Sequence, residues 1–220
     1  MLAEQLINEE IPVLSPSDKV SKALGLMDDY KLSHLTIVDD GIYKGMIDEN
    51  SLYNCEDDST SLTSLTKDYK MAFVLNHQHL FEVIKKVSDF QISSIPVINA
   101  QSKYLGGITL KLLMETIAEM PVVKTPGAII VLEMSMSDYS LFEISRIVEE
   151  DNAKILGSFI TRFPDSTKME LTIKLNVENV QSIMSSLERF KYTITASYNK
   201  KLVNDNLNDR YDQLMKYLNM

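Results

Sequence analysis

Apolar positions in the first 120 residues follow two alternating spacings, one typical of helices and one of short buried strands. Helical spacing of three and four residues occurs at Val20, Ala23, Leu24 and Met27. Residues 36–38 and 43–47 predict two strands, because the acidic and glycine residues between them form a typical turn sequence. The helix is expected to start near Ser17 or Asp18, whose side chains favour helix N-caps.

This pattern occurs twice, at an offset of 60 residues. The matched pairs include Val20 with Leu80, Val38 with Ile98 and, after one inserted residue, Gly45 with Gly106. The repeat predicts two copies of one strand–helix–strand–strand–helix unit, spanning 1–60 and 61–123, with a linker near 56–63 and a helix cap at Asn76. Neither copy is expected to bury its apolar face alone. A cleft between two such copies favours ligand sensing over catalysis.

The pattern changes after Pro121 and Pro126, which mark a boundary. Residues 124–200 predict the order β-α-β-β-α-β of a ferredoxin-like unit, with helices at 138–151 and 177–190. The predicted fold class is therefore α+β. Residues 201–220 predict an amphipathic helix that docks on its own domain or on a sister subunit. Its apolar stripe consists of Leu207, Tyr211, Leu214 and Leu218.

The charge of the chain argues against nucleic-acid binding. The net charge is −9 and neither half has an obvious basic face, so we expect no nucleic-acid partner.

The hydropathy and the cysteine content bear on where the protein resides. No apolar run approaches the roughly 18 residues of a membrane span, and the first residues lack the features of a signal peptide. We therefore expect a cytoplasmic protein without membrane contact. Cys55 is the single cysteine and has acidic neighbours, which excludes an internal disulfide and disfavours a reactive thiol.

Two segments of the second copy carry a family resemblance: residues 94–99, Ser-Ile-Pro-Val-Ile-Asn, and residues 104–109, Tyr-Leu-Gly-Gly-Ile-Thr. The repeat resembles a tandem pair of CBS domains, together called a Bateman module. Residues 127–198 resemble an ACT domain in their element order. The arrangement is similar to bacterial CBS–CBS–ACT proteins, including those of the acetoin-utilisation accessory type.

The resemblance implies clefts that bind adenosine nucleotides, with a hydroxyl on phosphate and an acid on ribose. The hydroxyl position holds Asp48 in copy one and Thr109 in copy two, and the acid position holds Ser51 and Leu112. Losing a charged hydrogen bond costs roughly 1.5–3 kcal/mol, so we expect weak nucleotide binding, a different ligand or none. The implied ligands are ATP, ADP, AMP or S-adenosylmethionine. The implied site residues are Ile95, Pro96, Val97, Thr109 and Lys111, with His34 and Asp48 from copy one.

The resemblance to ACT domains implies amino-acid binding at a subunit interface through the loop after the first strand. That loop contains Ser137, Asp138, Tyr139 and Ser140 and lacks glycine, so side chains would crowd a ligand that approaches the backbone. The alternative interpretation is that Ser137 or Asp138 caps the following helix. ACT-like units pair side by side, which predicts a homodimer.

Other candidate chemistry is sparse. His77 and His79 could suggest a metal, but positions i and i+2 of a helix do not face each other and no third ligand is apparent. His34 either lines the cleft or is an ordinary histidine. No nucleophile, base and oxyanion donor assemble, so we expect no catalysis. The leading hypothesis is a non-enzymatic regulatory sensor. The alternatives are a ligand-free scaffold that binds a protein target and, more remotely, an interface enzyme subunit.

Overall fold

The computed structural model describes residues 1–162, 167–199 and 215. The helix predicted for 201–220 lies outside the described residues, apart from position 215. The chain forms two compact units that separate after Ala118. The mixed α+β class is confirmed.

The first unit contains two repeats with the same element order. The first repeat consists of β1 (Val13–Leu14), α1 (Val20–Tyr30), β2 (His34–Asp39), β3 (Ile42–Asp48) and α2 (Glu49–Tyr53). The second consists of β4 (Val74–Leu75), α3 (Leu80–Phe90), β5 (Ser94–Ile98), β6 (Tyr104–Thr109) and α4 (Leu110–Ala118). Short 3-10 helices, η1 (Ala3–Leu6) and η2 (Leu62–Asp68), precede the two repeats. The strand–helix–strand–strand–helix order predicted from the repeat is confirmed.

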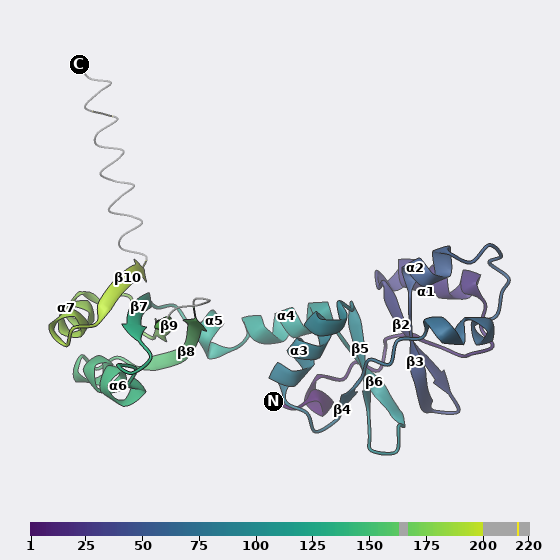
Figure 1. Cartoon of the computed structure of the whole chain (residues 1–220), viewed down its shortest axis with the longest axis horizontal. Helices are drawn as coiled ribbons and strands as arrows, with labels where there is room; N and C mark the ends of the chain where they lie inside the picture. Colours follow the sequence, from purple (N-terminus) through teal and green to yellow (C-terminus); the bar gives the residue numbers. More distant parts are fainter. Residues whose placement is uncertain (163–166, 200–214, 216–220) are drawn as a thin grey trace. The chain divides into compact units, whose positions relative to one another are not determined.

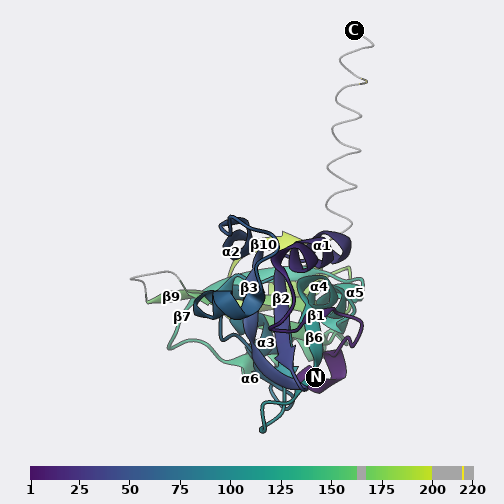
Figure 2. The same cartoon turned by 90° about the vertical axis from the view of Figure 1, so that its right-hand side faces the viewer.

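Each repeat has a three-stranded sheet, in the order β1-β2-β3 or β4-β5-β6, whose first pair is parallel and second pair antiparallel. Helices α1 and α2 lie together on one side of β2 and β3, as two perpendicular views show (Figures 1 and 2). The apolar faces of these helices and strands meet in a buried core that includes Leu14, Met27, Leu35 and Ile47. Burying a side chain of this size stabilises the fold by roughly 1.5–3 kcal/mol relative to exposure.

The segment that leads into each repeat packs on the other repeat. Asn8 bridges to Gly107 in the second repeat, whereas Lys70 bridges to Met46 in the first. The predicted linker therefore runs into a segment held against the first repeat, where Leu62 is fully buried. Each leading segment therefore packs on the opposite repeat, and these contacts hold the two repeats in one compact unit.

Helices α1 and α3 begin later than the sequence indicated, so the caps predicted at 17–18 and at Asn76 are wrong. The N-cap residues are Lys19 and His79. Asp18 instead accepts a hydrogen bond from the Ser15 amide at 2.8 Å, which closes the turn before the helix. The side chain of His79 accepts a hydrogen bond from the backbone at the start of α3, and Glu82 in the first turn of the helix completes a capping box.

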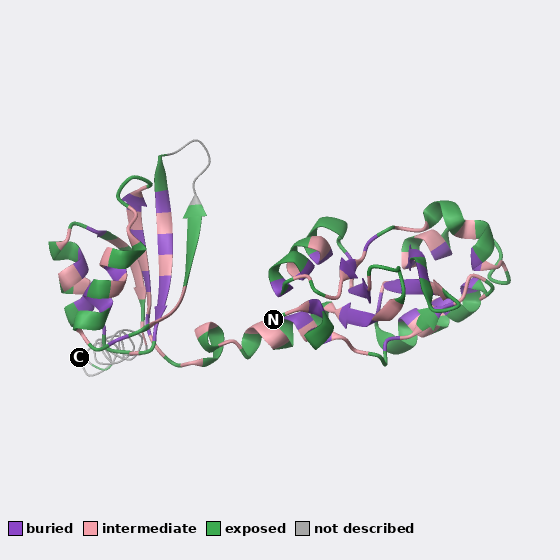
Figure 3. Cartoon of the chain, turned by 90° about the horizontal axis from the view of Figure 1, so that it is seen from below, coloured by how far each residue is buried: buried purple, intermediate pink, exposed green. Residues whose placement is uncertain are grey.

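The second unit is a four-stranded antiparallel sheet in the order β10-β7-β9-β8. Its elements are α5 (Pro121–Lys124), β7 (Ile129–Ser135), α6 (Leu141–Glu150), β8 (Ile155–Arg162), β9 (Lys168–Leu175), α7 (Gln181–Arg189) and β10 (Thr193–Tyr198). This is the β-α-β-β-α-β order predicted from sequence. Buried residues alternate along the central strands β7 and β9, and α6 and α7 lie on the same side of the sheet (Figures 1 and 3). Ile130, Leu132, Ile144 and Leu171 are among the core residues.

Helix α6 begins at Leu141, three residues later than predicted. Ser140 is its N-cap and accepts a hydrogen bond from the Glu143 amide at 3.3 Å. The cap predicted at Ser137 or Asp138 is therefore wrong. Because Ser137 and Asp138 lie outside the helix, the loop from β7 to α6 is longer than the sequence indicated.

Candidate functional site

The two repeats meet through the first residues of β2 and β5. The Ser33 amide donates to Ser93 Oγ at 3.1 Å, and the Ser93 amide donates to His34 Nδ1 at 3.4 Å. Ser94 Oγ donates to the carbonyl oxygen of His34 at 3.1 Å. His34, predicted to lie near the cleft, is thus buried at the pseudo-two-fold of the pair.

On the first-copy side of this junction, Asp48 forms an ion pair with a residue that sequence reasoning missed. Asp48 lies opposite His34 in the β2–β3 register and accepts a hydrogen bond from the Ser51 amide at 2.8 Å, which caps α2. Lys70 Nζ lies 3.0 Å from Asp48 Oδ2. Asp48 is thus engaged by a helix cap and by a lysine from the segment leading into the second repeat.

Burial and charge shift the pKa values of this cluster. Burial alone would raise the pKa of Asp48, but hydrogen bonds from Ser51 and Lys70 outweigh it and hold the pKa below its usual value. Burial lowers the pKa of His34, and the positive charge of Lys70 lowers it further, against the opposing effect of Asp48. The cluster therefore favours an ionised aspartate and a neutral histidine.

The second copy repeats this geometry without charge. Thr109 lies opposite Ser94 in the β5–β6 register, and its Oγ1 accepts a hydrogen bond from the Leu112 amide at 3.1 Å. The same position therefore caps a helix in both copies. The position equivalent to Lys70 is occupied by Asn8. Asn8 forms a β-bridge to Gly107 in β6 of the second repeat, just as Lys70 forms one to Met46 in β3 of the first. The hydroxyl hydrogen of Thr109 can still be donated to a ligand.

The remaining residues of the predicted nucleotide site differ in how far they are exposed to solvent. Ile95, Pro96 and Val97 are buried within β5, and Ile95 and Val97 are fully inaccessible. The side chain of Lys111 is 84% exposed, and its Nζ lies 3.8 Å from Glu115 on the next turn of α4. The structure therefore brings His34 and Asp48 together with Ser94, whereas the ammonium of Lys111 pairs along its own helix.

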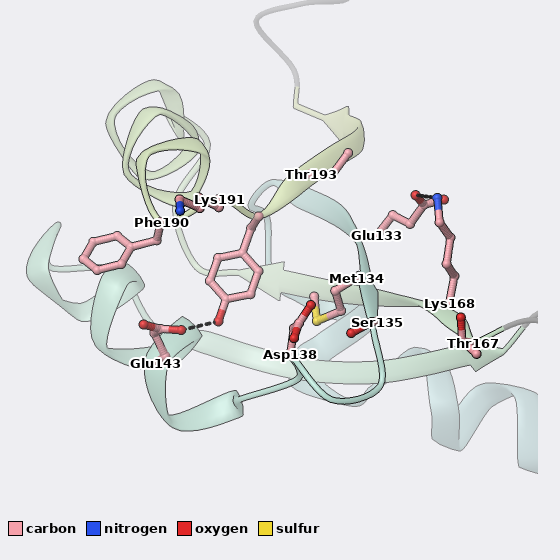
Figure 4. A pocket seen from close by; sticks show the side chains of 11 residues that line it. Glu133, Met134, Ser135, Asp138, Glu143, Thr167, Lys168, Phe190, Lys191 and Thr193 are labelled. Carbon is pink, nitrogen blue, oxygen red and sulfur yellow. Dashed lines mark hydrogen bonds and ion pairs between the residues drawn. The ribbon is translucent and has the colours of Figure 1, made fainter.

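A cavity of about 540 Å³ opens in the second unit, at the end of the sheet where strand β7 finishes. Because β7 is antiparallel to both neighbouring strands, the first residues of β9 and β10 lie at this same end of the sheet. Figure 4 shows the lining side chains converging from these strands, the β7–α6 loop and the end of α7. They are Glu133, Met134, Ser135, Asp138, Glu143, Thr167, Lys168, Phe190, Lys191, Tyr192 and Thr193.

The cavity combines carboxylates, ammonium groups and one buried phenol. Tyr192 donates its hydroxyl hydrogen to Glu143 Oε2 at 2.6 Å, as Figure 4 shows. Burial and then the Glu143 carboxylate raise the pKa of Tyr192, so the phenol stays a neutral donor. Lys168 Nζ and Glu133 Oε1 form an ion pair of 2.6 Å at one side. The site can therefore hold a small molecule that carries both signs of charge.

The structure distributes the four residues of the predicted ligand loop among different roles. Asp138 lines the cavity. Ser137 hydrogen-bonds to Ser135 and Asp138, at 2.7 and 3.2 Å. Tyr139 packs against the core, and Ser140 caps α6.

Sequence reasoning missed the cavity residues contributed by β9, by the end of α7 and by the start of β10. Lys168 is the first residue of β9, and Lys191 and Tyr192 follow α7. The signal that could have found them is the β-α-β-β-α-β order itself. In that topology the end of the first strand adjoins the starts of the third and fourth.

The described residues bear on two further features, metal centres and membrane-spanning helices. No group of three or more His, Cys, Asp or Glu side chains there could hold a metal ion. No helix there is long and apolar enough to cross a membrane.

The comparison with protein families concerns the first repeat. Residues 3–55 match the family model described as the CBS domain. This segment is similar to a CBS domain. The matched segment spans η1 to α2, and the second repeat has the same element order.

Solved structures resemble about half of the chain. A CBS domain pair/ACT domain protein from Thermotoga maritima is 18% identical, with a TM-score of 0.49, over 54% of this chain and 98% of that one. A putative acetoin utilization protein from Vibrio cholerae is 20% identical, with a TM-score of 0.45, over 54% of this chain and 90% of that one. CBSX2, solved in complex with AMP, is 18% identical, with a TM-score of 0.44, over 54% of this chain and 96% of that one.

Proposed function

We propose that this chain is a non-enzymatic regulatory protein that senses a small molecule in the cavity at the end of β7. The observation that carries the proposal is the convergence of Asp138, Lys191 and the Tyr192–Glu143 pair on one cavity of about 540 Å³. A volume in the range of roughly 300–1,000 Å³ is typical of small-molecule sites. The ligand class that fits is a free amino acid or a similar zwitterion, because acidic and basic side chains line the same cavity.

The cleft between the repeats supports a second candidate, an adenosine nucleotide held by the second copy. Thr109 is half-buried and retains a hydroxyl hydrogen to donate to a phosphate. The first-copy cleft is less suited, because the negative charge of Asp48 repels phosphate and Lys70 is already paired with it. Because the two clefts differ in charge, we expect only the cleft of the second copy to bind a nucleotide well.

A thermal-shift and calorimetric screen of the full chain tests both candidates. The probes are the common amino acids, ATP, ADP, AMP and S-adenosylmethionine. A ligand at 100 times its Kd should stabilise the protein by about 2.7 kcal/mol, a shift of a few degrees. The proposal predicts a shift with an amino acid that is lost in Asp138→Asn and kept in Glu188→Gln, an exposed carboxylate of the same unit outside the cavity.

Other results would favour other functions. A shift with an adenosine compound, lost in Thr109→Asn, would support the nucleotide site, since asparagine keeps the helix cap but removes the hydroxyl. Binding of no probe would favour the scaffold that acts by binding a protein target. Turnover of a probe by the purified chain would contradict a non-enzymatic role.

A further inference from the structure

Helices α6 and α7 cover one face of the sheet in the second unit and leave most of the opposite face open (Figures 1 and 3). Side chains alternate between the two faces of a strand, so Val131, between the core residues Ile130 and Leu132, lies on the open face. The strand register aligns one residue of each strand with Val131 in a row across the sheet. This uncharged row consists of Ala196, Val131, Thr172 and Phe159.

The chain itself covers one corner of the open face. Gly157 lies on this face, opposite Lys174 in the β8–β9 register, and a Cβ there would come within 2.6 Å of Val122 Cγ2 in α5. Helix α5 therefore packs on the start of β8. Beyond this corner Phe159 is 56% exposed in the part of the chain that the structure describes. An apolar row that crosses a whole sheet and ends in an exposed aromatic ring is a typical contact surface.

The segment that follows β10 is long enough to reach the uncharged row. Strand β10 is an edge strand of the sheet and ends at Tyr198, which lies on the open face opposite Ile129. Residues 199–206 can span roughly 26 Å when extended, which is ample for a return over the sheet. A helix over 207–218 would be about 17 Å long, and four strands are about 14 Å across. The apolar stripe predicted for this segment therefore matches the row in length.

Charge favours this segment over a second copy of the same face. Glu133 and Glu170 face each other in the β7–β9 register on the open face, beside the uncharged row. Two copies of the face would bring these carboxylates together, which costs free energy through repulsion. Residues 200–220 carry four basic and three acidic side chains, whereas the whole chain carries 22 and 31. The segment is also tethered, so its effective concentration at the face is on the order of millimolar.

We propose that residues 201–220 dock on the open face of their own sheet, with the stripe of Leu207, Tyr211, Leu214 and Leu218 against the uncharged row. This choice separates the two alternatives that the sequence leaves open, the segment's own domain and a sister subunit. The docking does not depend on the ligand proposed for the second unit.

Site-specific cross-linking of the full chain tests the docking. In a Cys55→Ser background, Met215→Cys is combined with either Thr161→Cys or Ser158→Cys. Thr161 and Ser158 are both exposed in β8, but they lie opposite Glu170 and Ile173 and therefore on different faces of the sheet. Both thiols should react equally with a monofunctional maleimide. We expect a short bis-maleimide to link positions 161 and 215 within one chain at least about tenfold faster than positions 158 and 215.

A charge in the stripe provides the second measurement. Leu214→Glu, added to the Thr161→Cys, Met215→Cys protein, should slow the link about tenfold. Gln213→Glu adds the same charge at the neighbouring position outside the stripe and should leave the rate unaltered. Equal or absent linking from positions 161 and 158, or insensitivity to Leu214→Glu, would overturn the proposal. A product found only as a covalent dimer would also overturn it, and would assign the segment to a sister subunit.

Discussion

Lys70 Nζ lies 3.0 Å from Asp48 Oδ2, although the two residues come from different copies of the repeat. The contact is possible because the segment that leads into the second copy pairs with β3 of the first, where Lys70 bridges to Met46. Asp48 also caps α2, so one carboxylate supports both a helix and the packing between copies.

Replacement of Asp48 separates these two roles. Asp48→Ala removes the cap and the ion pair, and should lower the free energy of unfolding by about 1–2 kcal/mol, most of it from the cap. Asp48→Asn keeps a capping oxygen and should cost less than about 1 kcal/mol, because Lys70 is partly exposed and water screens the pair. Urea unfolding at neutral pH measures both. Equal losses in the two variants would show that the ion pair dominates.

Acidification should destabilise the first unit through His34. Its folded pKa lies below the ordinary value of about 6.5, so the unfolded chain binds more protons between that value and the folded pKa. Stability from this group is therefore complete above about pH 6.5 and is lost as the pH falls through the folded pKa.

Substitution of the histidine isolates this effect. His34→Asn retains an acceptor for the Ser93 amide without a titrating ring, so the free energy of unfolding should depend less steeply on pH below about 6.5. The unsubstituted protein is the reference for this slope. Urea unfolding across this pH range measures both slopes. An unaltered slope in His34→Asn would contradict the assignment.

Two glycines of the first unit should respond to alanine with opposite signs. Gly106 has a φ of +140°, and a Cβ there would collide with Ile7 of the leading segment. Gly106→Ala should therefore cost more than about 2 kcal/mol. Gly25 lies within α1 with open space around its Cα, so Gly25→Ala should stabilise by roughly 0.5–1 kcal/mol. Thermal unfolding compares the pair, and a neutral Gly106→Ala would argue against the close approach of Ile7.

Removal of the Tyr192 hydroxyl should weaken the second unit. Tyr192→Phe leaves the Glu143 carboxylate without its donor, and hydrogen bonds to charged groups contribute roughly 1.5–3 kcal/mol. We expect a loss of about 1–2 kcal/mol, because Glu143 is only partly buried and regains water. Tyr198→Phe, at a side chain that is 62% exposed, is the control and should change stability by less than about 0.5 kcal/mol. Urea unfolding of both variants checks this, and equal effects would contradict a specific role for the Tyr192–Glu143 bond.

Local patterns in the sequence predict most of this fold. The repeat at an offset of 60 residues predicts two like units, since the same apolar spacing at Val20 and Leu80 buries the same helical face. The ferredoxin-like order follows from apolar periodicity in the same way. Helix starts are less predictable, because Lys19 and His79 become caps through tight turns that their residue types do not reveal.

Apolar periodicity and motif positions are local properties of the chain, so they are enough to predict the repeats, the element order and candidate residues such as His34, Asp48 and Asp138. The ion pair between Lys70 and Asp48, and the cavity that Lys191 and Tyr192 share with Asp138, arise only in the folded molecule. These contacts depend on strand register and on the exchange of leading segments between repeats. Both are fixed by the packing of elements far apart in the chain.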